Sequence, residues 1–223
     1  MPKEFLIDDS MVIPPAKDPS KIEIMRGPNI KELPKAQPFG ETVKGKALIK
    51  LGDNITTDHI TPAGTWLKYR SNVPKYSESV FSAIDAQFHE KAKAQGGGFV
   101  LGGENYGQGS SREHAVWALK DYGFFVIIAP SFADIFYSNC FKNGLLPIIL
   151  DSKTVDSLFQ TSSEIEVDLE AQKITTPTKT ISFEIDGHRK QILLKGLDDI
   201  AMTLEYEDEI SDYEKQATIP SLL

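Results

Sequence analysis

Two adjacent serines and an arginine lie where the sequence predicts a turn into a helix. Ser110, Ser111 and Arg112 follow the glycine-rich stretch 102–109, which comes directly after the apolar run 98–101. The N-terminus of a helix exposes unpaired N–H groups and the positive end of the helix dipole, so it attracts anions. The guanidinium group of an arginine is a planar fork that suits a carboxylate. The stretch therefore predicts a carboxylate-binding turn with a hydroxyl group beside the ligand.

The same residues also have a purely structural interpretation. Glu113 comes three residues after Ser110, which is the spacing of a capping box. On spacing alone the cap is favoured, and Arg112 would then be a surface charge. The glycines do not fall as G-x-G-x-x-G, and no lysine follows the last glycine, so neither a dinucleotide fingerprint nor a phosphate loop is indicated.

Composition places the chain among soluble globular proteins. It has 223 residues, 40% hydrophobic and 25% charged, which is enough for one domain with a full core. The net charge of −8 argues against general nucleic-acid binding, which needs a basic surface. No apolar run reaches the length of a membrane span, and the first residues lack the apolar core of a signal peptide. We expect a cytoplasmic protein without membrane or nucleic-acid partners.

Cys140 is the single cysteine of the chain. It lies in an apolar, helix-like stretch, and we interpret it as a buried structural thiol. One cysteine cannot form an intrachain disulfide, and it cannot hold an iron–sulfur cluster, which needs about three or four thiolates. The four histidines, of which His89 and His188 are expected at the surface, make no metal set with it. We therefore expect no metal bound by this chain.

Strands and helices are predicted to alternate through the compact part of the chain. Strands are expected at 43–51, 99–101, 124–129, 145–150 and 164–169, a loop at 53–64, and helices at 79–94, 111–121, 131–142 and 152–160. A β-hairpin is expected at 181–194, with its turn at Asp186-Gly187, and a terminal helix with an acidic face at 198–216. This alternation indicates an α/β fold.

Residues 1–40 contain seven prolines, which predicts an extended arm. We therefore divide the chain into a linker arm, 1–40, and a folded domain, 41–223.

Longer strings in this sequence resemble the aconitase superfamily. Gly-Ser-Ser-Arg-Glu-His at 109–114 is similar to the signature of that family's C-terminal swivel domain. Further similar stretches follow the family order: 52–64, Arg70-Ser71-Asn72, and 127–135 followed by 144–147. The resemblance covers roughly residues 25–150. It implies a swivelling β/β/α domain of the aconitase C-terminal type.

The resemblance also implies roles for individual residues. Ser110 matches the family's catalytic base, and Ser111 and Arg112 match contacts to the substrate carboxylates. Arg70 matches an arginine that binds the terminal carboxylate of the substrate, although by itself it would be judged a surface charge. Asp58 occupies a position that belongs to the active site.

Three further residues are expected to support this site. His59 forms an Asp-His pair with Asp58, which can orient an imidazole, but a hydrogen-bonded loop pair is the simpler interpretation of these residues alone. Glu113 is expected to cap the helix. His114 completes the motif as a supporting residue.

The implied reaction is dehydration and rehydration of a hydroxy-tricarboxylate. The first hypothesis is the C-terminal domain of an aconitate hydratase, which interconverts citrate and isocitrate via cis-aconitate. Such a domain is inactive alone, because the 4Fe-4S cluster is ligated outside this chain, on the N-terminal domains of the same enzyme. The Pro-rich arm, Arg70-Ser71-Asn72 and the Asp58-His59 pair favour this hypothesis.

Two alternatives remain open. One is the small subunit of an isopropylmalate or homoaconitate isomerase, which would have a large subunit as partner. The stretch 134–144 resembles such small subunits. The other belongs to a different class of function: a regulatory RNA-binding module, against which the acidic net charge argues.

Overall fold

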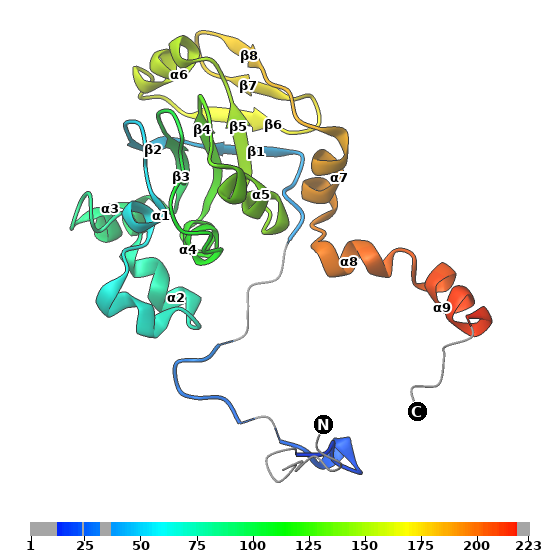
Figure 1. Ribbon diagram of the computed structural model, residues 1–223. Helices are drawn as coiled ribbons and strands as arrows, with labels where there is room; N and C mark the ends of the chain where they lie inside the picture. The colour runs from blue at the N-terminus through cyan, green and yellow to red at the C-terminus, as the bar shows by residue number, and fades with distance from the viewer. Residues whose placement is uncertain (1–12, 24, 32–36, 218–223) are drawn as a thin grey trace, which may run out of the picture.

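Two four-stranded sheets and a layer of helices make up the folded part of the protein (Figure 1). The computed structural model describes residues 13–23, 25–31 and 37–217. One sheet is parallel, with the order β2-β3-β4-β5: β2 is Ala47–Lys50, β3 Gly98–Leu101, β4 Phe124–Ala129 and β5 Leu146–Ile149. The other is antiparallel, with the order β1-β6-β7-β8: β1 is Thr42–Gly45, β6 Ile165–Asp168, β7 Lys173–Thr175 and β8 Thr180–Ser182.

Helices connect the parallel strands and follow the antiparallel ones. The α-helices are α1 (Thr57–Ile60), α2 (Val73–Tyr76), α3 (Phe88–Gln95), α4 (His114–Asp121), α5 (Asp134–Lys142), α6 (Ser152–Phe159), α7 (Gly187–Lys195), α8 (Asp199–Leu204) and α9 (Glu207–Gln216). The 3-10 helices are η1 (Pro19–Lys21), η2 (Gly64–Tyr69) and η3 (Ser77–Ser79). Helix α4 leads from β3 to β4, and α5 leads from β4 to β5.

The parallel sheet separates two apolar layers. Val100 and Ile127 pack with the helical layer, whereas their neighbours Leu101 and Ile128 pack toward the antiparallel sheet. Successive strand residues point to opposite faces, so apolar runs without alternation are what a sheet covered on both sides requires. This stacking confirms the predicted α/β fold.

The predicted strand 43–51 is two strands that belong to different sheets. The chain leaves β1 at Gly45 and enters β2 at Ala47, where β1 pairs with β6 and β2 pairs with β3. At this crossing the backbones approach closely, and a Cβ on Gly45 would lie 3.3 Å from the Cα of Gly98.

The predicted helix 79–94 is much shorter in the structure. Phe81 has a positive φ of 55° and donates its N–H to the Ile60 carbonyl, which interrupts any helix there. Only Phe88–Gln95 is α-helical. Two other helices start three residues later than predicted, α4 at His114 and α5 at Asp134.

The hairpin predicted at 181–194 is wrong. Asp186 accepts a hydrogen bond from the Arg189 N–H at 3.1 Å and so caps α7, instead of forming a β-turn. The antiparallel pair lies one strand earlier, between β7 and β8. The terminal helix is divided into α8 and α9 by Glu205 and Tyr206.

The described residues of the N-terminal segment are exposed from Ile13 to Lys31 and lie away from the sheets in Figure 1. Two backbone hydrogen bonds join this segment to the folded part: the Lys31 N–H donates to the Ser71 carbonyl at 2.7 Å, and the N–H of Phe39, which is 8% exposed, donates to the Leu193 carbonyl at 2.9 Å. The division into an arm and a folded domain stays a prediction. Within the ranges given above, no helix is long and apolar enough to cross a membrane.

Candidate active site

The loops that follow β2, β3 and β4 meet at the carboxyl edge of the parallel sheet. Thr56 forms a parallel bridge with Gln108, and Tyr106 forms one with Phe132. The Gly107 N–H donates to the Ile55 carbonyl at 2.7 Å. Open parallel sheets bind ligands in the crevice outside this edge. Asp58 of the first loop and the turn 109–112 of the second, here called the serine–arginine turn, are thereby brought together.

Close contact between these loops depends on glycine at position 107. Gly107 has a φ of 82°, and a Cβ at this position would lie 2.2 Å from Cγ of Phe136. A side chain here would be strained and would also collide with α5. The loop therefore reaches its place only with glycine at this residue.

Ser110 does not cap the helix. The N-cap residue of α4 is Glu113, and its side chain makes no hydrogen bond to the helix. Ser110 is exposed, and its N–H donates to Oγ1 of Thr57 at 3.2 Å. The capping-box interpretation is therefore wrong for Ser110, and so is the capping role predicted for Glu113. The Ser110 hydroxyl is free of that structural task.

Arg112 and Asp58 form an ion pair across the two loops. Nη2 of Arg112 donates to Oδ1 of Asp58, and the arginine side chain is only 20% exposed. Its Nε is buried and has no hydrogen-bond partner among the described residues. A buried donor without a partner is costly, so the Arg112 Nε is available to donate to a ligand carboxylate. Ser111, next in the chain, is exposed.

His59 does not pair with Asp58. Its Nδ1 accepts a hydrogen bond from the Thr56 N–H at 3.1 Å, and its own N–H donates to Oγ1 of Thr56 at 3.1 Å. These two bonds form a capping box at the start of α1. The structure therefore gives His59 a local structural task.

The imidazole of His114, the first residue of α4, is partly buried beside two aromatic rings. Burial lowers the pKa of the His114 imidazole, and the charges of Arg70 and Arg112 lower it further. The imidazole ring lies 4.8 Å from the Trp117 ring and 6.1 Å from the Tyr76 ring, measured between ring centroids. A neutral imidazole adds no third positive charge beside Arg112 and Arg70.

Tyr76 was not predicted as a site residue. It is 1% exposed, and its hydroxyl has no hydrogen-bond partner among the described residues, like Nδ1 of His114. Tyr76 lies buried at the end of α2. From the sequence alone it is indistinguishable from an ordinary core aromatic residue. No spacing signal links it to a histidine 38 residues later in the chain.

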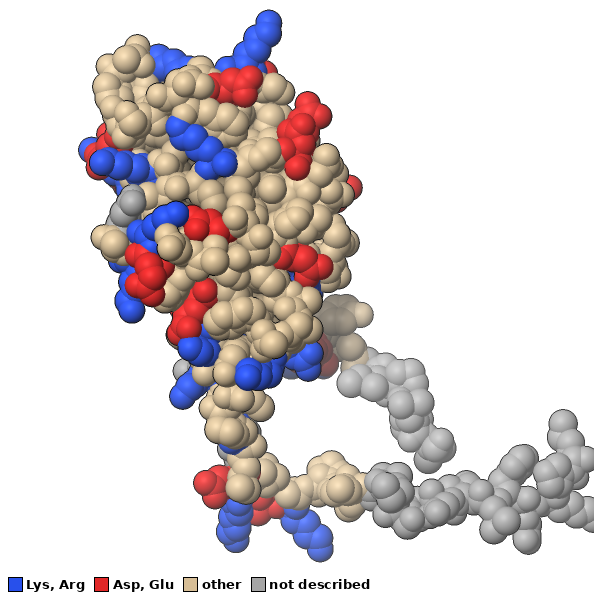
Figure 2. Space-filling model, turned by 90° about the vertical axis from the view of Figure 1, so that its left-hand side faces the viewer, with Lys and Arg blue, Asp and Glu red and all other residues tan. Residues whose placement is uncertain are grey.

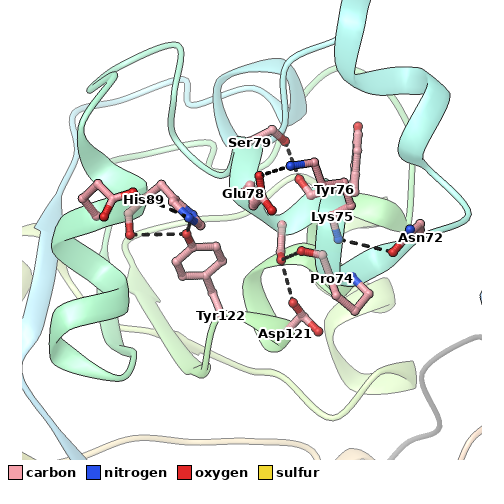
Figure 3. A network of polar contacts seen from close by, with 11 residues as sticks. Asn72, Pro74, Lys75, Tyr76, Glu78, Ser79, His89, Asp121 and Tyr122 are labelled. Atoms are coloured by element: carbon pink, nitrogen blue, oxygen red, sulfur yellow. Dashed lines mark hydrogen bonds and ion pairs between the residues drawn. The ribbon is translucent and has the colours of Figure 1, made fainter. Parts of the chain in front are cut away.

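Polar contacts fasten the segment that follows Arg70 (Figure 3). Arg70 itself is exposed. Asn72 caps α2 by accepting from the Lys75 N–H, and Lys75 forms an ion pair with Glu78. Asp121 at the end of α4 accepts from the Ser77 hydroxyl at 2.6 Å. These contacts tie the Arg70 segment to the helix whose first residue is His114.

Comparison with known proteins agrees with this architecture. Residues 67–153 match the aconitase C-terminal domain family, and residues 156–187 match the family model described as LeuD_N. The 3-isopropylmalate dehydratase small subunit of Bacillus cereus is 44% identical over 187 residues, covering 79% of this chain and 96% of the relative. This chain belongs to that family of small subunits.

Other members of the family differ in how far the match extends. The small subunit of Ruthia magnifica is 59% identical over 125 residues, which is 56% of this chain and 61% of that relative. The crystal structure of the 3-isopropylmalate dehydratase from Methanocaldococcus jannaschii superposes with a TM-score of 0.64 at 32% identity, covering 77% of this chain and 99% of the other. These relatives favour the small-subunit alternative over the aconitate hydratase domain. They give no support to citrate, isocitrate or the tricarboxylic acid cycle.

The serine–arginine turn of this small-subunit homologue lines neither of the two best-formed surface pockets of the described residues. Two surface pockets, of about 390 and 460 Å³, lie elsewhere: one at residues 43–48 and 96–99, the other between α2, α3 and the end of α4. Ser110 and Ser111 are both exposed to solvent.

An iron–sulfur cluster does not fit the residues of this chain. Cys140 is buried, burial raises the pKa of its thiol, and the chain has no second cysteine. In the described part of the chain, no group of three or more His, Cys, Asp or Glu residues could hold a metal ion.

Proposed function

We propose that this chain is the small-subunit component of a hydro-lyase that isomerises isopropylmalate by dehydration and rehydration. The observation that carries the proposal is the exposed Ser110 two residues before Arg112, whose buried Nε has no hydrogen-bond partner in the described part of the chain. Similarity to small subunits over 96% of one relative's length supports the choice of enzyme. The active site would be completed by a large subunit, which would hold any 4Fe-4S cluster.

Ser110 is proposed as the base that removes a proton from the carbon next to a substrate carboxylate. A serine hydroxyl acts as a base only when nearby cations and N–H dipoles stabilise its alkoxide. Arg112 can supply that charge. Its guanidinium group and the Ser111 hydroxyl would hold the carboxylate while negative charge develops on the substrate. Asp58 would orient Arg112 through their ion pair.

Arg70 is the observation that favours a second candidate, an isomerase or hydratase acting on a tricarboxylate. A cation suits a third carboxylate, whereas an isopropyl group prefers an apolar wall. Arg70 lies near enough to His114 for its charge to lower the pKa of the imidazole. The substrate class is therefore proposed from the relatives, and Arg70 is the residue whose role the kinetics must decide.

The RNA-binding alternative has less support. Figure 2 shows acidic and basic side chains interspersed over one face of the protein, without a continuous basic surface there. The net charge of −8 acts in the same direction.

Reconstitution tests the proposal. The purified chain is mixed with a cluster-bearing large subunit of the isopropylmalate dehydratase type, and isomerisation of isopropylmalate is followed with each protein alone and with both. We expect turnover only in the mixture. Turnover of isopropylmalate by the chain alone would contradict the proposal that a large subunit completes the active site. Turnover of citrate but not isopropylmalate by the mixture would favour the second candidate, and RNA binding at moderate salt without any turnover would favour the third.

A further inference from the structure

Three residues on one face of α4 converge on a single residue at the end of α5. Asn143 accepts a hydrogen bond from the Trp117 indole N–H at 2.7 Å and donates from Nδ2 to the Glu113 carboxylate at 2.7 Å. Its backbone carbonyl accepts from the Lys120 ammonium at 2.7 Å. Positions 113, 117 and 120 are spaced as i, i+4 and i+7, which places them on one face of a helix. Asn143 thus forms hydrogen bonds to residues at the start, middle and end of α4.

The bond to Glu113 acts where the helix meets the serine–arginine turn. Glu113 directly follows Arg112, and its carboxylate contacts Asn143 instead of capping α4. The Trp117 side chain lies against the His114 ring, which in turn lies near Arg112. Asn143 also donates to the Asn139 carbonyl at 2.9 Å, so its amide is fixed within α5.

We propose that Asn143 is a positioning residue that sets the orientation of Ser110 and Arg112 by clamping Glu113 and Trp117. The inference rests on the proposed function of that turn. Asn143 is about half-buried, and its hydrogen bonds given above reach neither Ser110 nor Ser111, so it would act through Glu113 and Trp117 and through Asn139, whose Nδ2 donates to the Ser111 carbonyl at 3.4 Å. Its amide is the group required, because one atom must accept from an indole while the other donates to a carboxylate.

A polarity exchange tests this clamp. Asn143→Asp keeps an acceptor for Trp117 but places a carboxylate against the Glu113 carboxylate. Adding Glu113→Gln returns a donor to position 113, so the hydrogen bond can form again with reversed direction. A displacement of about 1 Å can cost a factor of about 100 in rate, so we expect Asn143→Asp to lower kcat by roughly 10- to 100-fold. The double variant should recover to within roughly threefold of the wild type, because the two sites are directly coupled.

The assay is steady-state kinetics of the reconstituted enzyme, together with the NMR signal of the Arg112 Nε–H. Asp151→Ala is the control for lost stability, since it removes the cap of α6, which Asp151 forms with Thr154, and no hydrogen bond of Asn143. It should lower the melting temperature and leave kcat and the Arg112 signal unchanged. Asn143→Ser provides a second variant if Asn143→Asp does not fold.

An unchanged kcat and an unchanged Arg112 signal in the single variants would overturn the clamp, as would a double variant no better than Asn143→Asp. Absence of turnover in the wild-type pair would count against the proposed function alone. In that case the Arg112 signal, which should move in the single variant and return in the double, still decides whether Asn143 positions the turn.

Discussion

Replacing Ser110 with alanine separates catalysis from folding at this residue. The Ser110 hydroxyl is exposed, and its backbone N–H, which donates to Thr57, survives the substitution. The N-cap position belongs to Glu113. Ser110→Ala therefore removes no structural hydrogen bond of the helix, and any large effect must come from the reaction.

The two interpretations of Ser110 differ in magnitude as well as in kind. Loss of a capping side chain costs about 1 kcal/mol of stability. Loss of an exposed side chain without such a role costs less than about 0.5 kcal/mol. Loss of a general base lowers the rate by roughly 10²- to 10⁴-fold, which corresponds to about 3–5 kcal/mol in the barrier. We expect unchanged stability and a fall in kcat of that size, with KM largely kept.

The assay combines thermal melts of the variant chain with steady-state kinetics of the reconstituted enzyme on isopropylmalate. Ser163→Ala is the matched control, because Ser163 is also exposed but lies before β6. Ser111→Ala should instead raise KM, because Ser111 is predicted to contact a carboxylate. A Ser110→Ala enzyme whose kcat stays within tenfold of the wild type would refute the base. A loss of about 1 kcal/mol with normal turnover would restore the cap.

Three further predictions concern substrate choice, packing and pH. Arg70→Leu should weaken transition-state binding of tricarboxylates by roughly 2–5 kcal/mol and have little effect on isopropylmalate. Arg70→Lys should lose part of the same binding energy. If the ratio of kcat/KM for the two substrate classes is unchanged, Arg70 is a surface charge. Gly107→Ala should destabilise the chain by about 1–2 kcal/mol for the positive φ, plus about 1–3 kcal/mol for the contact with Phe136, and a melting temperature equal to the wild type would contradict the loop packing. The pKa of His114 is lowered from 6.5, so its contribution to stability is complete above pH 6.5 and is lost as the pH falls toward the lower, folded-state pKa. His114→Phe should therefore lose less stability than the wild type between about pH 7 and pH 5, and equal losses in urea titrations would contradict the burial of a neutral imidazole.

Strand positions in the parallel sheet could be predicted because burial on both faces leaves a direct mark on the sequence. The runs 124–129 and 145–150 are apolar without alternation, and both contain parallel strands of the sheet. The helix at 152–160 was also predictable, because Asp151 caps it and its apolar residues recur at helical spacing.

Elements decided by distant contacts could not be predicted in the same way. Nothing between Val43 and Leu51 indicates that the chain changes sheets, because pairing with β6 or with β3 is decided by residues far along the sequence. The Asp186-Gly187 pair is equally suited to a β-turn and to a helix start. In the structure Asp186 caps α7, so the local signal for a β-turn was misleading.

The same distinction holds within the candidate site. The motif predicts which residues belong to it, but its local spacing predicted a capping serine, and the structure replaces that local bond with long-range ones. Glu113 bonds to Asn143, 30 residues away, and the Ser110 N–H bonds to Thr57, 53 residues away. A turn that is held from both sides in this way needs no capping side chain. The serine hydroxyl groups and the Arg112 Nε are therefore not required for structural hydrogen bonds. This explains how a sequence with the spacing of a capping box can present exposed serines, and why the residues that hold them there carry no motif of their own.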